Sequence, residues 1–99
     1  MTQLETALHP GDILKRDFLD KYLISAGQVA KAVRVPRTRI ERIVAHDRGI
    51  TPDTAFRLAR LFGNTPEFWL DLQRTYELAQ TTKDEALAFD LERITPIAP

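Results

Sequence analysis

Residues 25–45, SAGQVAKAVRVPRTRIERIVA, decide the fold of this chain. On both sides of a break at position 36, apolar residues recur at helical spacing: Val29, Ala30 and Val33 before it, and Ile40, Ile43 and Val44 after it. Pro36 disfavours helical geometry in the residue before it, and its own fixed φ suits the start of a helix. The stretch therefore predicts two short helices joined by a tight turn, the first of them capped by the Ser25 hydroxyl.

The second of these helices turns a polar face away from its apolar stripe. Its outward residues are Arg37, Thr38, Arg39, Glu41 and Arg42. Arg42 follows Thr38 by four residues, so these two share one face with Arg37. An α-helix fits the major groove of DNA, where arginine can bond guanine through two hydrogen bonds. The face therefore indicates DNA binding, although a charged outer face on a short helix is usually only solvated surface.

Charge is unevenly distributed along a chain whose formal net charge is zero. Residues 31–48 carry six basic and two acidic side chains, whereas residues 49–99 carry five basic and eight acidic ones. A positive segment on an otherwise acidic body is typical of a DNA-binding face. The overall balance argues against a protein that binds any polyanion indiscriminately.

The segment before residue 25 predicts one more helix. Residues 1–8 show no periodicity and are expected to form a loose arm. His-Pro-Gly at residues 9–11 then opens a helix that runs to about Lys21, because proline is tolerated at a first helical position. The inward residues of this helix, spaced by four, are Leu14, Phe18 and Tyr22. We expect His9 itself to be a structural or surface residue.

Start signals for two further helices follow Gly49, which we expect to end the helix before it. Thr-Pro-Asp at residues 51–53 and Thr-Pro-Glu at residues 65–67 each supply a hydroxyl cap, a proline at the first position and a carboxylate. The helix from Pro66 has the inward stripe Phe68, Trp69, Leu72, Tyr76 and Ala79. Leu70 falls outside that stripe, which hints at a partner surface, although a single exposed leucine is otherwise normal.

Thr-Lys-Asp-Glu at residues 82–85 is a capping-box pattern with Thr82 as the cap, and it predicts a last short helix to about Arg93. We therefore expect an all-α chain of five or six helices. A helix-turn-helix DNA-binding domain is expected over residues 9–80, and a C-terminal helix and tail over residues 81–99.

The residue patterns of enzymes are missing. The sequence has no cysteine, no pair of histidines at metal-ligand spacing, and no glycine-rich phosphate loop among its four glycines. No stretch approaches the length of a membrane span, and nothing at the N-terminus indicates secretion. We expect a cytoplasmic protein that is not an enzyme and has no metal, no cofactor and no membrane association.

The order and spacing of these pieces resemble a known family. Residues 25–45 look like the helix-turn-helix of the phage-repressor-like (Xre or Cro/CI) superfamily. The longer string from HPGDIL at residue 9, through RGIT at residue 48 and TAFRLARLFG at residue 54, to TPEFWLDLQ at residue 65, resembles the HigA (VapI-like) antitoxins. Arg34 departs from the pattern, because the superfamily often has glycine there; a left-handed arginine would cost about 1 kcal/mol.

The resemblance implies a function and partners. It implies a homodimeric transcriptional repressor that binds double-stranded operator DNA, represses its own operon and binds a HigB-type, RNA-cleaving toxin. It places Arg37, Thr38 and Arg42 at the bases. It places four residues nearer the DNA backbone: Gln28, Arg39, His46 and Arg48. Two other functions stay open, an orphan regulator without a toxin and an interaction module that only sequesters a partner. The helix from Pro66 and the tail from Thr82 are the candidate dimer surface.

Overall fold

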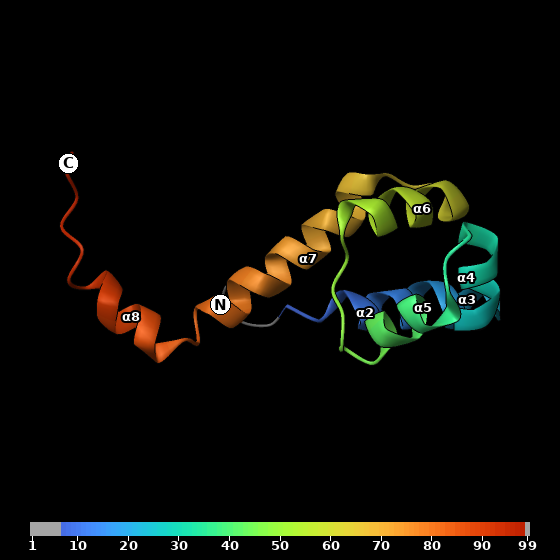
Figure 1. Cartoon of the computed structure of the whole chain (residues 1–99), viewed down its shortest axis with the longest axis horizontal. Coiled ribbons are helices and arrows are strands. Elements are labelled where there is room, and N and C mark those ends of the chain that lie inside the picture. The colour runs from blue at the N-terminus through green and yellow to red at the C-terminus, as the bar shows by residue number, and fades with distance from the viewer. Residues whose placement is uncertain (1–6, 99) are drawn as a thin grey trace.

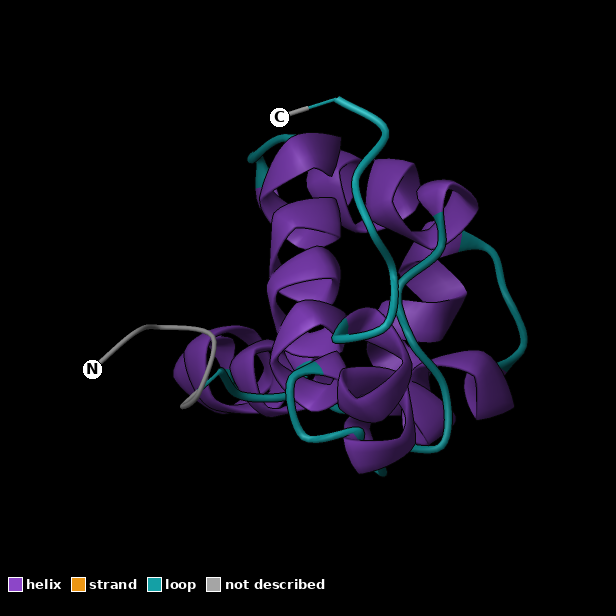
Figure 2. Cartoon of the chain, turned by 90° about the vertical axis from the view of Figure 1, so that its left-hand side faces the viewer, coloured by secondary structure: helices purple, strands orange, loops and turns teal. Residues whose placement is uncertain are grey.

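The structure, a computed structural model, describes residues 7–98, and every regular element in that range is helical (Figure 1). The elements in chain order are α2 (Pro10–Ile13), η1 (Leu14–Leu19), α3 (Asp20–Tyr22), α4 (Ala26–Val33), α5 (Arg37–Val44), α6 (Pro52–Phe62), α7 (Pro66–Thr81) and α8 (Glu85–Leu91). The first three follow one another without a break and form one continuous helix. The described residues therefore contain six helices, which confirms the predicted fold class. Figure 2 shows the helices and the loops between them from the end at which α8 lies.

The core lies where the helices from α2 to α7 meet. Its almost completely buried side chains are Leu14, Val29, Ala30, Ile40, Ile43, Ala55, Leu58 and Trp69. Trp69 Nε1 donates to Asn64 Oδ1 at 2.8 Å, so the indole is buried without an unpaired polar atom. Burial of a large apolar side chain contributes about 1.5–3 kcal/mol. These contacts fix α5 against the rest of the body.

The first helix departs from the spacing that the sequence predicts. Its middle, Leu14–Leu19, is π-helical, and the Asp20 N–H donates to the carbonyl five residues earlier. Such a turn adds one residue to the helical register. Leu19 therefore enters the core, and Tyr22, which the α-helical spacing placed there, is 53% exposed. Tyr22 lies against Phe62 instead, with ring centroids 6.2 Å apart.

The turn between α4 and α5 is held from both sides. Arg34 takes the left-handed conformation, with φ 67°, at a cost of about 1 kcal/mol that glycine would not incur. The Val35 N–H donates to Ala30 O at 3.0 Å and closes the end of α4. From α6, Arg57 Nη1 donates to Val33 O at 2.7 Å.

Most helix starts follow the predicted caps. The caps confirmed for α4, α6 and α7 are Ser25, Thr51 and Thr65. Pro36 is the cap of α5 and not its first helical residue, because its ψ of 144° is extended. Asp84, not Thr82, caps α8, since the Asp84 carboxylate accepts the Leu87 N–H at 3.0 Å.

Two further predictions are wrong. Gly49 does not end α5: the helix ends at Val44, and His46 takes the left-handed conformation with φ 69°. Leu70 is not an exposed partner residue, because it packs against the core, whereas Phe68 of the predicted inward stripe is 39% exposed. The reason is that α7 packs against both α2 and α6, which together cover more than one face of it.

The C-terminal part of the molecule extends away from the core. α7 runs out of the body, and α8 lies at its far end (Figure 1), so the molecule measures 50 × 25 × 22 Å. Of the arm predicted over residues 1–8, residues 1–6 lie outside the described range, and Ala7 and Leu8 form no regular structure. The division of the chain at residues 80 and 81 stays a prediction. None of the helices within residues 7–98 is both long enough and apolar enough to span a membrane.

Candidate nucleic-acid interface

α5 presents the candidate interface because its two faces differ in polarity. Ile40 and Ile43 are fully buried on one side. The residues that α5 exposes on the other side are Arg37, Thr38, Glu41 and Arg42. The structure thus brings Arg37, Thr38 and Arg42 onto one outward surface, as the spacing predicts. A helix anchored through its apolar side and bare on its charged side can enter a groove without disturbing the core.

Arg37 is partly arranged before any contact with DNA. Its Nε lies 3.3 Å from Glu41 Oε2 one turn later in the helix, although 71% of the Arg37 side chain is exposed. Its aliphatic part lies over Gly27 of α4, because a Cβ at position 27 would come within 3.1 Å of Arg37 Cδ. Any larger residue at Gly27 would push the arginine aside. The glycine therefore matters for the shape of this surface.

Arg42 and Arg48 are exposed side chains on α5 and in the loop after it. Among the ion pairs within residues 7–98, none involves either guanidinium. An unpaired arginine needs no internal bond broken before it contacts a base or a phosphate. These two guanidinium groups are therefore exposed and not held by an ion pair within the described residues.

Arg39 has a different environment from its neighbours. Its Nη1 lies 2.6 Å from Asp53 Oδ1 at the start of α6, and only 24% of its side chain is exposed. The same carboxylate oxygen accepts Arg57 Nε at 2.8 Å. These hydrogen bonds, from Arg57 first and then Arg39, lower the pKa of the Asp53 carboxyl below its usual value. Asp53 thus links the start of α5 to α6, which also holds the turn through Arg57.

The side-chain amide oxygen of Gln28 helps to cap the start of α4. Its Oε1 accepts the Ser25 N–H at 2.8 Å, while the Ser25 hydroxyl accepts the Gln28 N–H at 3.1 Å. This reciprocal pair is a capping box. The side chain is exposed, so its amide nitrogen is fixed in place and can still donate to an anion at the surface.

His46 turns towards the first helix. Its Nε2 lies 2.7 Å from Asp12 Oδ1, and its ring stacks on His9 with centroids 4.4 Å apart. His9 is buried, and its Nδ1 accepts the Gly11 N–H at 2.9 Å, which caps α2. Burial lowers the pKa of the His9 imidazole, nearby His46 lowers it further, and Asp12 opposes the change. The loop after α5 is therefore attached to α2 by the two imidazoles.

Sequence reasoning missed the role of Asp53 and Arg57. Their spacing of four residues on one helix predicts an ion pair. The bond from Asp53 to Arg39, fourteen residues earlier, has no signal in a single sequence. Gly27 carried no prediction either, because its role depends on how α4 crosses α5. Within residues 7–98, no group of three or more His, Cys, Asp or Glu side chains is arranged to hold a metal ion.

Comparisons with known proteins agree with this geometry. The sequence profile of the helix-turn-helix family matches residues 15–70. The chain is 44% identical to virulence-associated protein I of Dichelobacter nodosus over 79 residues, which span 80% of this chain and 73% of that protein. The solved antitoxin HigA of Pseudomonas aeruginosa with the higBA promoter has TM-score 0.83 and 36% identity, covering 93% of this chain and 99% of that one. An addiction module antidote protein of the HigA family from Coxiella burnetii has TM-score 0.82 and 40% identity, covering 91% and 97% respectively.

Proposed function

The chain belongs to the helix-turn-helix family, and we propose that it is a HigA-type antitoxin. In this role it is a sequence-specific repressor that binds its own operator and neutralises a HigB-type, RNA-cleaving toxin. Two observations carry the proposal. The HigA antitoxin that this chain resembles along nearly its whole length was solved with its promoter, and α5 here presents an exposed arginine face on a buried apolar stripe.

The reading of bases is assigned to the outward surface of α5. Arg37, Thr38 and Arg42 would face the base edges when α5 lies in the major groove. A bidentate arginine contact to guanine discriminates against the wrong base by about 1–3 kcal/mol. Arg37 must leave or share its partner Glu41 to make such a contact, so Arg42 is the stronger candidate.

The holding of the DNA backbone is assigned to residues around α5. The proposed phosphate contacts are Gln28, Arg39, His46 and Arg48. Gln28 and Arg48 have exposed donor groups. Arg39 and His46 already bond carboxylates within the protein, Asp53 and Asp12. We therefore expect these two to contribute less affinity than Arg48.

We infer a homodimer because one short helix contacts too few base pairs to select a single operator. A single short helix contacts only a few base pairs, and a mismatched base pair costs about 1–3 kcal/mol. Two copies about 34 Å apart would read two half-sites of a palindrome on one face of the duplex. The proposed repressor is therefore a two-fold dimer on operator DNA.

The toxin is assigned to a surface away from α5. Residues 49–99 have an excess of acidic side chains, which complements the basic surface expected of an RNA-cleaving protein. The protein acts by binding and has no catalysis of its own in this proposal. Because its target is operator DNA, its proposed place of work is the cytoplasm.

Fluorescence anisotropy with the DNA upstream of the chain's own gene tests the repressor function. Tight binding to that duplex and much weaker binding to a scrambled duplex at the same salt concentration is the expected result. Equal binding to both would favour the interaction module. Co-purification with the product of the neighbouring gene tests the antitoxin function, and an operator-binding chain without such a partner would be an orphan regulator.

A further inference from the structure

Glu41 lies near the centre of the outward face of α5. Successive residues of an α-helix are about 100° apart around its axis. Thr38 therefore points almost directly away from the buried side of α5, with Glu41 about 60° to one side of it and Arg42 about 40° to the other. Arg37 lies further round, about 100° from Thr38. A face that meets DNA through Thr38 and Arg42 therefore brings the Glu41 carboxylate to the DNA as well.

A carboxylate on this face lowers the affinity for DNA unless a hydrogen-bond donor meets it. Phosphates repel an anion, and so do the two acceptors that guanine presents in the major groove and the O4 acceptor of thymine. Adenine places its N6 donor beside the N7 acceptor, whereas cytosine presents its N4 donor alone. Cytosine is therefore the base whose edge suits the Glu41 carboxylate best.

The ion pair between Arg37 and Glu41 leaves groups on both side chains available to bases. Arg37 Nε lies 3.3 Å from Glu41 Oε2, and the two side chains are 71% and 50% exposed. Because the pair uses Nε and one carboxylate oxygen, both Nη groups of Arg37 and the second oxygen of Glu41 remain. Exposed pairs at this spacing are weak. Arg37 also lies over Gly27, so its position does not depend on Glu41 alone.

We propose that Glu41 is a specificity-determining residue that selects cytosine at one position of each half-site. Its carboxylate accepts the N4–H of that cytosine and excludes guanine and thymine, whose acceptors it repels. Arg37 and Arg42 supply affinity on either side of it, whereas Glu41 lowers binding to every sequence that lacks the cytosine. The inference rests on the proposed repressor function and adds one base that the operator must contain.

Anisotropy titrations on a set of operator duplexes test this assignment. Each base pair of the half-site in the upstream duplex is changed in turn to the other three. The unmodified chain should show one position at which cytosine gives about fivefold to a hundredfold tighter binding than guanine or thymine. Glu41→Ala should lose that preference and keep the preferences at all other positions. No loss at any position, or loss of a preference for a base other than cytosine, would overturn the proposal.

Binding of Glu41→Ala to a scrambled duplex gives a second readout. The variant should bind this duplex about twofold to fivefold more tightly than the unmodified chain, since a charge that repels phosphates is gone. The sign is opposite to the one expected when an arginine that contacts DNA is removed. Unchanged or weaker binding to the scrambled duplex would mean that the carboxylate does not face DNA, and the proposal would fail.

Glu41→Gln provides a test that a folding defect cannot imitate, because it predicts a gain. A glutamine amide can donate to N7 of adenine and accept from its N6 amino group. At the selected position, the variant should therefore bind the adenine duplex at least as tightly as the cytosine duplex, whereas the unmodified chain favours cytosine. A variant that still rejects adenine would show that Glu41 does not contact this base pair.

The Arg37→Ala background separates a direct contact from an effect through Arg37. In this background the preference for cytosine should persist, and it should disappear when Glu41→Ala is added. If Arg37→Ala alone abolishes the preference, Glu41 acts only by holding Arg37, and the proposal fails.

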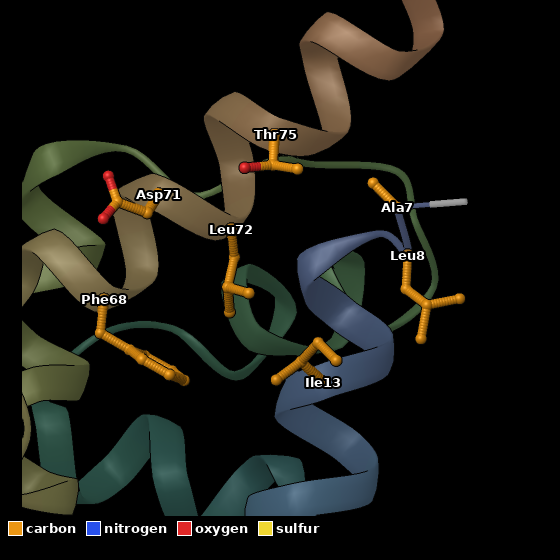
Figure 3. A pocket seen from close by; sticks show the side chains of 7 residues that line it. All are labelled: Ala7, Leu8, Ile13, Phe68, Asp71, Leu72 and Thr75. Atoms are coloured by element: carbon orange, nitrogen blue, oxygen red, sulfur yellow. The ribbon is translucent and has the colours of Figure 1, made fainter. Parts of the chain in front are cut away.

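A matched ion pair on α7 controls for the loss of one negative charge. Arg74 Nη2 lies 2.9 Å from Asp71 Oδ1, and the two side chains are 70% and 60% exposed. Asp71 lines an open apolar groove between the first helix and α7 (Figure 3), and none of the residues that line this groove belongs to α5. Asp71→Asn should keep every base preference of the unmodified chain. If it loses the preference for cytosine, net charge and not a base contact is responsible, and the proposal fails.

The same titrations distinguish failure of this inference from failure of the proposed function. If the unmodified chain prefers particular bases and none of these preferences depends on Glu41, the repressor function stands and the inference fails. If the unmodified chain binds all duplexes alike, both fail.

Discussion

The helix-turn-helix and the α7–α8 extension differ in how much tertiary packing stabilises their helices. α4 and α5 are short helices, but Ile40 and Ile43 are fully buried and Val29 nearly so, so tertiary packing holds them. α8 is of similar length and has no buried residue. Two helices of similar length thus differ in burial, and only one of them contributes to the core. This difference leads to tests that apply equal changes to the two regions.

The largest expected contrast is in the free energy of unfolding. Leu58→Ala removes a fully buried side chain and should cost about 2–5 kcal/mol. Leu91→Ala at the surface of α8 should cost less than about 0.5 kcal/mol in a dilute, monomeric sample. Denaturant titration followed by circular dichroism measures both. A loss for Leu91→Ala as large as that for Leu58→Ala in dilute solution would place α8 in the core.

Substitutions in and just after α5 should distinguish side chains that contact bases from side chains that contact the DNA backbone. Arg42→Ala should lower operator affinity by about 1–3 kcal/mol and change binding to a scrambled duplex much less. Arg48→Ala should weaken binding to both duplexes alike and reduce the slope of affinity against salt by about one. Affinities at two salt concentrations, on both duplexes, provide the measurement. Equal losses on the two duplexes for Arg42→Ala would mean that α5 holds DNA without reading it.

A smaller effect is expected at the contact between α2 and the loop after α5. The folded protein lowers the pKa of His9 below its usual 6.5, so the unfolded chain binds more protons when the pH falls below that value. Stability should therefore be full above about pH 6.5 and decline as the pH falls from there. Protonation of Nδ1 would also remove the acceptor that caps α2. Thermal unfolding across this pH range measures the decline, and His9→Asn, which keeps a capping oxygen, should reduce it. An unchanged pH profile in that variant would assign the decline to another group.

The smallest effect is expected on toxin binding when the arginines of α5 are changed. Arg37→Ala and Arg42→Ala together should leave toxin binding unchanged, because the proposed toxin surface lies outside α5. Calorimetry with the purified toxin measures the affinity of the double variant against the unmodified chain. Loss of toxin binding would show that the two surfaces overlap.

The fold was largely predictable because periodicity and caps are local. Ser25, Thr51 and Thr65 cap the helices that the sequence predicts. Tyr22 was misplaced because a π-helical turn shifts the register without any signal in the residue pattern. Leu70 was misplaced because a single stripe cannot reveal that two helices cover α7.

The sequence predicted which residues of the candidate site face outward. It did not predict the hydrogen bonds that some of them make within the protein. The outward positions of Arg37, Thr38 and Arg42 follow from helical spacing alone. The bonds of Arg39 to Asp53 and of His46 to Asp12 join residues that are 14 and 34 positions apart. Contacts at such separations depend on tertiary packing, which propensity and spacing do not encode.

The bond from Arg57 to the turn has a consequence for engineering. The carbonyl of Val33 at the end of α4 is held by a side chain from α6, outside the two-helix motif, and Arg34 stores strain at the same place. Residues 25–45 transplanted alone into another scaffold would keep their outward arginines and lose the clamp that sets the angle of α5. The motif is therefore not a portable module, and a graft that retains its geometry must include α6.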